Sequence, residues 1–232
     1  MRARVLVSLG ALVAASLWCV LLLVVRKHEY GAAGYPYLAW NLVLAWLPLI
    51  FAALLVVTYA RSRSAIELLA VGAAWLVFLP NAPYVLTDFI HLGTQHRLFD
   101  TVLIASFALT ALALGFVSLV LVQLVVTRAA GAALGWLTAI ASLFAASFGI
   151  YLGRVLRFNS WDVVQRPHRL LELAKLRLDD PFGNRYLIGF TVALGCMLAL
   201  AYLGLYGFTM LVSSVKREQQ PLVGSERRWP SR

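Results

Sequence analysis

Long, uninterrupted runs of apolar residues dominate this sequence. Several of them reach the roughly 20 residues that an α-helix needs to cross a hydrocarbon core of about 30 Å. In a chain of 232 residues with 62% hydrophobic and 13% charged residues, little is left for a soluble domain. The sequence therefore predicts an all-α, polytopic transmembrane bundle of about six spans over residues 1–212, followed by a polar, disordered tail over residues 213–232.

The net charge of +10 lies mainly in short connections and in the tail. A nucleic-acid interface would need these charges on one soluble face with aromatic side chains between them, and the sequence predicts no such face. Attraction to anionic head groups explains the charges, so the expected partners are membrane lipids and not nucleic acid. Cys19 and Cys196 lie in separate apolar runs, and we expect neither a disulfide nor a cofactor. The oligomeric state does not follow from the sequence.

The ends of the apolar runs give the expected spans. The first run is too long for a cleavable signal peptide and ends in the basic residues Arg26 and Lys27, which indicates a retained span. Asp100 precedes the fourth run and has the residue type of a helix N-cap. Pro167–Leu178 has the amphipathic pattern of a short interfacial helix between the fifth and sixth spans. The predicted spans are Val5–Val25, Pro36–Tyr59, Ala65–Leu79, Thr101–Thr127, Ala132–Leu152 and Tyr186–Val212.

The third span ends too early. Its apolar register lasts from Ala65 to Leu79, about 22 Å of helix, and Pro80 and Pro83 then break the helical hydrogen bonding. Two alternatives follow. Either the chain reaches the membrane surface at Asn81, or irregular backbone lies at membrane depth, where it must be buried in protein or line a wet cavity.

Six spans place the connections after the first, third and fifth on one side of the membrane. Three polar segments, 35–41, 80–91 and 154–162, should therefore meet at one face, and the amide of Asn41 should find a partner on a neighbouring helix. Lysines and arginines divide equally between the two sides. When Arg154 and Arg157 are set aside as site residues and the interfacial helix is not counted as an ordinary loop, the remaining bias predicts cytoplasmic termini and polar segments outside a cell membrane.

Three polar motifs resemble the bacterial membrane family catalogued as domain of unknown function 1361. The resemblance implies an integral membrane protein, here of a bacterial inner membrane, and brings no established activity. The family pattern often has a Trp-Tyr pair before the acid at Asp100, whereas Leu98 and Phe99 stand here, so a phenol there is not essential. The motifs are Trp75–Tyr84 with Thr87–Phe89, Phe148–Arg154, and Arg157–Asp162, together with the pairs Tyr35–Pro36 and Trp40–Asn41.

The leading functional hypothesis is a site for an anionic substrate, such as a phosphorylated lipid head group or a lipid-linked sugar. Arg154 and Arg157 are spaced to share one helical face, and guanidinium groups suit phosphate and carboxylate. The same arginines could instead pair with acids and only hold the loops together. The remaining candidates are Asp88 and Asp162 as acid or base, and Asn81, Tyr84, Asn159 and Trp161 as substrate-binding residues.

Other classes of function are weaker alternatives. Asp88 and His91 could begin a metal site, with His96, Asp100 or Asp162 as further ligands, but no diagnostic metal motif is present. A non-enzymatic assembly or accessory protein would use the polar motifs structurally, and a small-solute carrier would use the broken third helix. Whether the protein is an enzyme stays open. The residues with expected structural roles are Asn41, Pro80, Pro83, Gly149 and Gly153.

Overall fold

The structure, a computed structural model, describes residues 2–31, 35–62, 64–155 and 185–224, with the single positions 168, 172 and 183. Every regular element in these ranges is helical, and six helices are long and apolar enough to cross a membrane. The predicted all-α bundle of six spans is confirmed. The chain divides into two compact units, Met1–Gly195 and Cys196–Arg232, and every polar cluster discussed below lies in the first.

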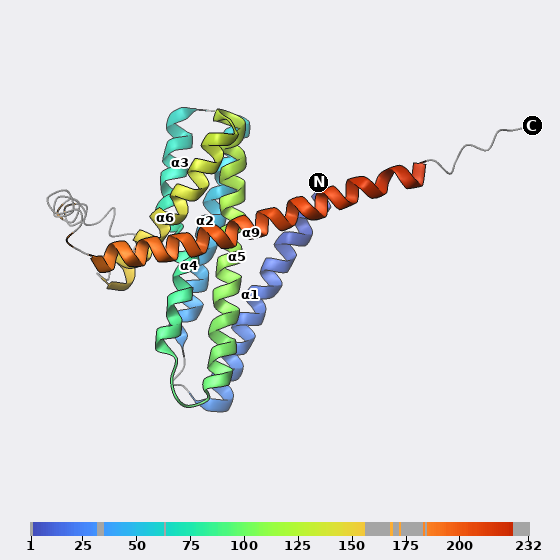
Figure 1. Ribbon diagram of the computed structural model, residues 1–232. Coiled ribbons are helices and arrows are strands. Elements are labelled where there is room, and N and C mark those ends of the chain that lie inside the picture. Colours follow the sequence, from blue (N-terminus) through green and yellow to red (C-terminus); the bar gives the residue numbers. More distant parts are fainter. Residues whose placement is uncertain are drawn as a thin grey trace, which may run out of the picture. The chain divides into compact units, whose positions relative to one another are not determined.

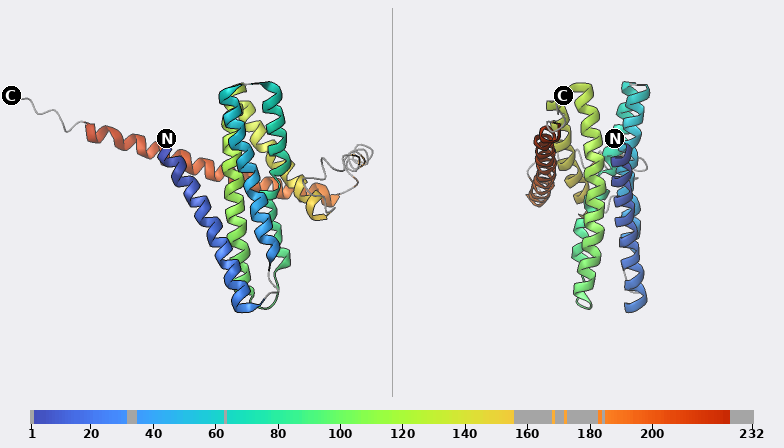
Figure 2. Two further views of the ribbon diagram at one scale, coloured as in Figure 1. Left: turned by 180° about the vertical axis from the view of Figure 1, so that it is seen from behind. Right: turned by 90° about the vertical axis from the view of Figure 1, so that its right-hand side faces the viewer.

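The first unit is a bundle of antiparallel helices (Figure 1). In Figures 1 and 2, α2, α3 and α5 run side by side, whereas α1 diverges from them toward its N-terminus. The elements are α1 (Arg2–Tyr30), α2 (Pro36–Arg61), α3 (Ala65–Phe78), α4 (Asn81–Tyr84), the 3-10 helix η1 (Val85–His91), α5 (Arg97–Ala130), α6 (Ala132–Val155) and α9 (Arg185–Gly224).

Several helices are longer than the sequence predicted. Helix α1 continues past Val25 to Tyr30, and α9 continues past Val212 to Gly224. Helix α5 begins before Asp100, so this residue is not an N-cap but part of the first turn. The predicted interfacial helix, apart from two isolated positions, and the last residues of the predicted tail lie outside the described residues.

The core of the first unit forms where α2 packs against α5. Buried residues recur on α2 at helical spacing, so one face of this helix is apolar and turned inward. Many large apolar side chains elsewhere are exposed, as expected for helices whose outer faces meet lipid. The buried residues at this contact include Leu38, Leu42, Ala45 and Leu49 of α2 and Leu103, Ile104, Phe107 and Ala111 of α5.

The third span is interrupted at the prolines but does not turn back to the surface. Leu79 and Pro80 keep right-handed helical dihedral angles, and α4 and η1 continue the span to His91. Because Pro83 has no N–H to give to the carbonyl of Leu79, the N–H of Ala82 donates to it instead, at 3.2 Å. Ala82 and Pro83 are buried. The observed arrangement is therefore irregular backbone packed within the protein.

The change in hydrogen bonding explains the role of the Asn81 side chain. In a regular helix the N–H of Ala82 would donate to the carbonyl of Phe78, and its shift to Leu79 leaves that carbonyl without its usual partner. The side-chain amide of Asn81 donates to the Phe78 carbonyl at 2.9 Å. In this contact Asn81 acts on the backbone at the joint between α3 and α4.

Two glycines leave room for this joint. A Cβ atom at Gly115 of α5 would lie 2.8 Å from Cβ of Ala82, and one at Gly149 of α6 would lie 2.5 Å from Cγ of Pro80. Neither neighbour is the end of a flexible side chain, so neither can move aside easily. The absence of side chains at these two positions lets α5 and α6 enclose the interrupted part of the third span.

Substitution of Gly149 by alanine should therefore destabilise the protein. The added methyl group overlaps the rigid ring of Pro80, and overpacking of this kind costs about 1–3 kcal/mol. Gly72→Ala is the matched control, because a Cβ atom there meets nothing within 4 Å and alanine favours the helix. Melting temperatures in mild detergent should fall for the first variant and stay equal or rise for the second. Equal melting temperatures for both would contradict the packing described for the joint.

Candidate functional site

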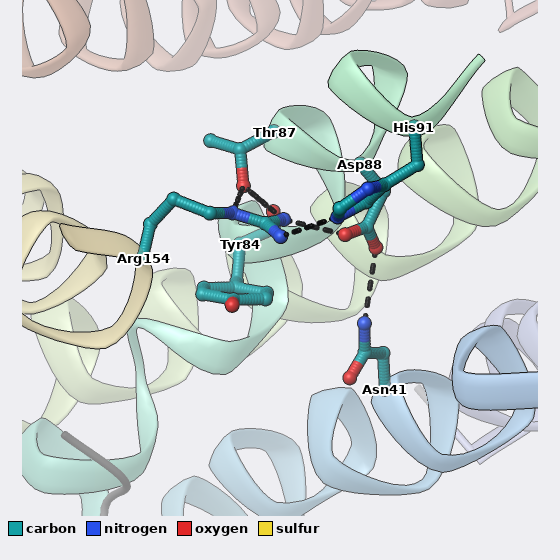
Figure 3. A network of polar contacts seen from close by, with 6 residues as sticks. All are labelled: Asn41, Tyr84, Thr87, Asp88, His91 and Arg154. Atoms are coloured by element: carbon teal, nitrogen blue, oxygen red, sulfur yellow. Dashed lines mark hydrogen bonds and ion pairs between the residues drawn. The ribbon is translucent and has the colours of Figure 1, made fainter. Parts of the chain in front are cut away.

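An ion pair between Arg154 and Asp88 forms the centre of the site (Figure 3). Arg154 lies in the last turn of α6, and Asp88 lies in η1. The Nη2 group of Arg154 donates to Oδ1 of Asp88 at 2.5 Å. The Asp88 side chain is only 1% exposed, whereas that of Arg154 is 19% exposed. The carboxylate is thus enclosed by protein, and the guanidinium covers it from the outside.

Three further side chains hold the guanidinium of Arg154. Thr87 accepts from Nε at 2.9 Å and from Nη2 at 2.5 Å, while its own hydroxyl donates to the carbonyl of Tyr84 at 2.7 Å. The Tyr84 ring lies beneath the guanidinium, 4.3 Å from Cζ to the ring centroid, which is a cation–π geometry. Nη1 lies 3.1 Å from Nε2 of His91.

The contact with His91 determines which ring nitrogen carries hydrogen. A guanidinium can only donate hydrogen bonds, so Nε2 of His91 must accept from Arg154. In the neutral imidazole the hydrogen then resides on Nδ1. Because His91 is exposed, this Nδ1–H is a second donor available at the outer edge of the site.

Asn41 completes the enclosure of Asp88. Its side-chain Nδ2 donates to Oδ2 of Asp88 at 3.0 Å, so Asn41 has the partner on a neighbouring span that its position predicts. The pair Asn41–Asp88 and the pair Asp88–Arg154 bring segments 35–41, 80–91 and the end of α6 together. The predicted meeting of these polar segments on one face is confirmed for the part of each that the structure describes.

Helix lengths can be compared with the thickness of a membrane. From Arg61 back to Asn41, α2 rises about 30 Å, and from Ala132 to Arg154, α6 rises about 33 Å, close to the thickness of a hydrocarbon core. Arg61 and the connection before Ala132 lie at the opposite end of the bundle. If that end marks one boundary, Arg154 and Asn41 lie at the level of the head groups on the other.

A second buried ion pair lies nearby, and the sequence did not reveal it. Nε of Arg26 donates to Oδ1 of Asp100 at 2.6 Å, and Nη2 of Arg26 donates to Oδ2 at 3.3 Å. Arg26 is 6% exposed and Asp100 is 1% exposed. Arg26 is therefore not an exposed terminal anchor, and Asp100 pairs with it instead of capping α5. As at Arg154, an aromatic ring faces the guanidinium, with 5.2 Å from Cζ of Arg26 to the centroid of Tyr30.

Tyr35 connects this second pair to the loop that follows η1. Its hydroxyl donates to Oδ2 of Asp100 at 3.1 Å and accepts from the N–H of Gly93 at 3.4 Å. Burial raises the pKa of the Tyr35 phenol, so the phenol keeps its hydrogen at neutral pH and stays a donor. The sequence signal for this cluster is Gly31. This residue type often ends a helix, and because it lies beyond Arg26, α1 can include Arg26.

The other predicted site residues divide into two groups. Tyr84 contacts Arg154, whereas Asn81 donates to a backbone carbonyl at the helix joint. Among the residues that the structure describes, no three His, Cys, Asp or Glu side chains lie close enough to hold a metal ion, and Asp88 and His91 both face Arg154. The candidates outside the described residues are Arg157, Asn159, Trp161 and Asp162.

Comparison with known proteins adds a family but no activity. The model of the family described as "Protein of unknown function (DUF1361)" matches residues 40–212, which is most of the chain. No curated protein and no solved structure matches the chain. The matched range contains the Arg154–Asp88 pair and Asp100, whereas Arg26 and Tyr35 precede it.

The unequal exposure of the Arg154–Asp88 pair predicts unequal effects of removing either partner. Arg154→Gln leaves the enclosed Asp88 carboxylate without a counter-charge and should cost about 3–5 kcal/mol. Asp88→Asn leaves a guanidinium that can reach water and should cost less, about 1–3 kcal/mol. Unfolding free energies from detergent titration measure both, and the double variant should lose less than the sum of the two.

The control for these variants is Arg97→Gln. Arg97 is exposed at the start of α5, and its replacement should change stability by no more than about 0.5 kcal/mol. A larger loss for Asp88→Asn than for Arg154→Gln would show that the carboxylate, not the guanidinium, is the accessible partner.

Proposed function

The chain belongs to the family of proteins of unknown function DUF1361 and is an integral membrane protein. Because family membership supplies no reaction, we propose a function from the geometry of the site. We propose that it binds an anionic group at Arg154, carried by a phospholipid or a lipid-linked substrate at the membrane surface. Guanidinium groups bind phosphate and carboxylate with charge-assisted hydrogen bonds. The partners are membrane lipids.

The observation that carries this proposal is the direction of the Arg154–Asp88 pair. The carboxylate is enclosed and the cation is partly exposed, so the pair presents its positive end outward. Nη2 and Nε of Arg154 are occupied by Asp88 and Thr87, whereas Nη1 contacts His91 alone among the residues that the structure describes. An arriving anion would accept from Nη1 and from the Nδ1–H of His91.

The residues at the site would have distinct roles. Asp88, Thr87 and the ring of Tyr84 hold the guanidinium in one orientation, which lowers the entropy lost when an anion binds. Both oxygens of Asp88 accept hydrogen bonds from neighbours, so positioning suits it better than proton transfer. Four predicted residues follow α6 closely in the sequence. We propose that Arg157, Asn159 and Trp161 complete the binding site and that Asp162 is the candidate acid or base beside it.

Two other functions have less support. A purely structural staple, as in an assembly or accessory protein, fits the internal hydrogen bonds of Arg154 but leaves its outward exposure without a purpose. A small-solute carrier would need polar groups at midplane. The described spans offer only neutral side chains there, such as Ser118, whose hydroxyl accepts from the indole N–H of Trp75 at 3.2 Å.

Retention of anionic lipid tests the proposal. Purified protein is exposed to phosphatidylglycerol or phosphatidylcholine, and bound lipid is counted by native mass spectrometry. Loss of a charge-assisted hydrogen bond worth about 1.5–3 kcal/mol should weaken phosphatidylglycerol binding by Arg154→Gln roughly 10- to 100-fold. His91→Phe, which removes the second donor but keeps a ring, should weaken it less.

The controls separate binding from folding and from charge alone. Arg97→Gln should bind phosphatidylglycerol like the original protein, and phosphatidylcholine binding should be weak throughout. Competition with inorganic phosphate distinguishes a lipid ligand from a free anion. If Arg154→Gln remains folded and retains phosphatidylglycerol fully, the pair is a structural staple and the proposal fails.

We further propose that the termini face the cytoplasm of a bacterial inner membrane and that the site opens on the outer side. The proposal rests on basic residues, which favour the end of the bundle that carries Arg61 and Arg128 once Arg154 and Arg157 are set aside as site residues. The site would then meet the outer leaflet.

Cysteine labelling tests this orientation. In a Cys19→Ser, Cys196→Ser background, Gln95→Cys and Ala130→Cys place one thiol near each end of α5. A membrane-impermeant maleimide added to intact cells should label only Gln95→Cys, and both should react after permeabilisation. Outside labelling of Ala130→Cys alone reverses the orientation, and outside labelling of both positions contradicts a single crossing between them.

A further inference from the structure

We infer that Arg26, Asp100 and Tyr35 form a positioning cluster, in which the ion pair docks α1 against α5 and Tyr35 positions His91 beside Arg154. This inference rests in part on the function proposed for Arg154. Arg26 and Asp100 are both more than nine-tenths buried and neutralise each other. No cation other than Arg26 forms an ion pair with Asp100 in the part of the chain that the structure describes.

The cluster joins elements that are distant in sequence. Arg26 belongs to α1, Asp100 to the first turn of α5, and Tyr35 precedes α2. Through its hydroxyl, Tyr35 also accepts the N–H of Gly93, two residues beyond the end of η1. The Tyr35 hydroxyl thus restrains both the connection between α1 and α2 and the connection between η1 and α5.

A line of aromatic contacts leads from the cluster to the site. The rings of Tyr35 and Tyr37 form a T-shaped pair at a centroid distance of 6.0 Å, and those of Tyr37 and His91 form another at 5.5 Å. His91 in turn accepts from Arg154. The Gly93 contact and this line of rings both bear on His91, the residue that we assign as the second donor for the anion.

Among the described side chains, helix α1 has few other polar contacts that would hold it in place. Ser16 accepts from the indole N–H of Trp46 at 3.2 Å, and Sγ of Cys19 lies 3.4 Å from Oγ1 of Thr110. Most large side chains along α1 are exposed, so packing contributes less here than at the α2–α5 contact. Since an unpaired Asp100 would be a buried charge without compensation, Arg26 is the contact that requires α1 to dock.

The short distance between Cys19 and Thr110 provides a direct measure of docking. In a Cys196→Ser background, Thr110→Cys places a second thiol opposite Cys19, and copper-phenanthroline oxidises neighbouring thiols to a disulfide. Intact mass after maleimide treatment counts the free thiols. The otherwise unchanged protein should cross-link, whereas Asp100→Asn and Arg26→Gln should lose most of the cross-link. Exchange of the charges, Arg26→Asp with Asp100→Arg, should restore part of it.

Tyr35→Phe separates positioning from docking. It keeps the charge pair and the ring but removes the hydroxyl that joins Asp100 to Gly93. We expect it to cross-link normally and to bind phosphatidylglycerol more weakly. Asp88→Asn is the complementary control, which should leave intact the cross-link between Cys19 and the thiol introduced at position 110.

The outcomes distinguish this inference from the function on which it partly rests. Full cross-linking in Asp100→Asn overturns the docking role, and normal lipid binding in Tyr35→Phe overturns the positioning role. If the original protein binds no phosphatidylglycerol, the proposed function fails. The cross-link still decides whether Arg26 holds α1. A shifted NMR signal of labelled His91 in Tyr35→Phe supports the positioning role, and an unchanged signal overturns it.

Discussion

Two buried carboxylates constrain how this bundle can assemble. Asp88 and Asp100 are each enclosed by protein near one end of the helices, where an ionised group without a partner would cost several kcal/mol. Each is neutralised by an arginine from another helix, and each arginine faces a tyrosine ring. The helices that carry these charges must therefore reach their observed neighbours before the membrane protein is stable.

The interrupted third span is the other feature on which the site depends. A regular helix would carry its own backbone hydrogen bonds and could lie against its neighbours in many registers. The prolines leave carbonyl groups that Ala82 and Asn81 satisfy, and Gly115 and Gly149 enclose the joint closely. This packing sets the position of η1, and with it the distance between Asp88 and Arg154.

The sequence predicted the class, the six spans and the meeting of polar segments, because these follow from hydrophobic length and from parity. It also left open the pairing of Arg154 with Asp88, which the structure shows. It missed the pairing of Arg26 with Asp100 because a basic residue after an apolar run has the same pattern whether it ends the helix or stays inside it. Gly31 indicates where α1 ends, but only the packing of α1 against α5 shows that Arg26 pairs with Asp100. The joint at Pro80 was ambiguous for a related reason, since burial of irregular backbone depends on neighbours that no local pattern specifies.

The two ion pairs have similar chemistry but different access, and this difference separates support from function. Arg26 and Asp100 are both buried, and the extended end of α1 supplies the arginine of this pair. Arg154 has no such cover among the described residues, so its guanidinium keeps an outward side while Asp88 holds it from within. The family match contains both carboxylates but begins after α1. A helix outside the matched range thus completes the Arg26–Asp100 pair, and the Arg154–Asp88 pair retains the exposed cation that an anionic head group could reach.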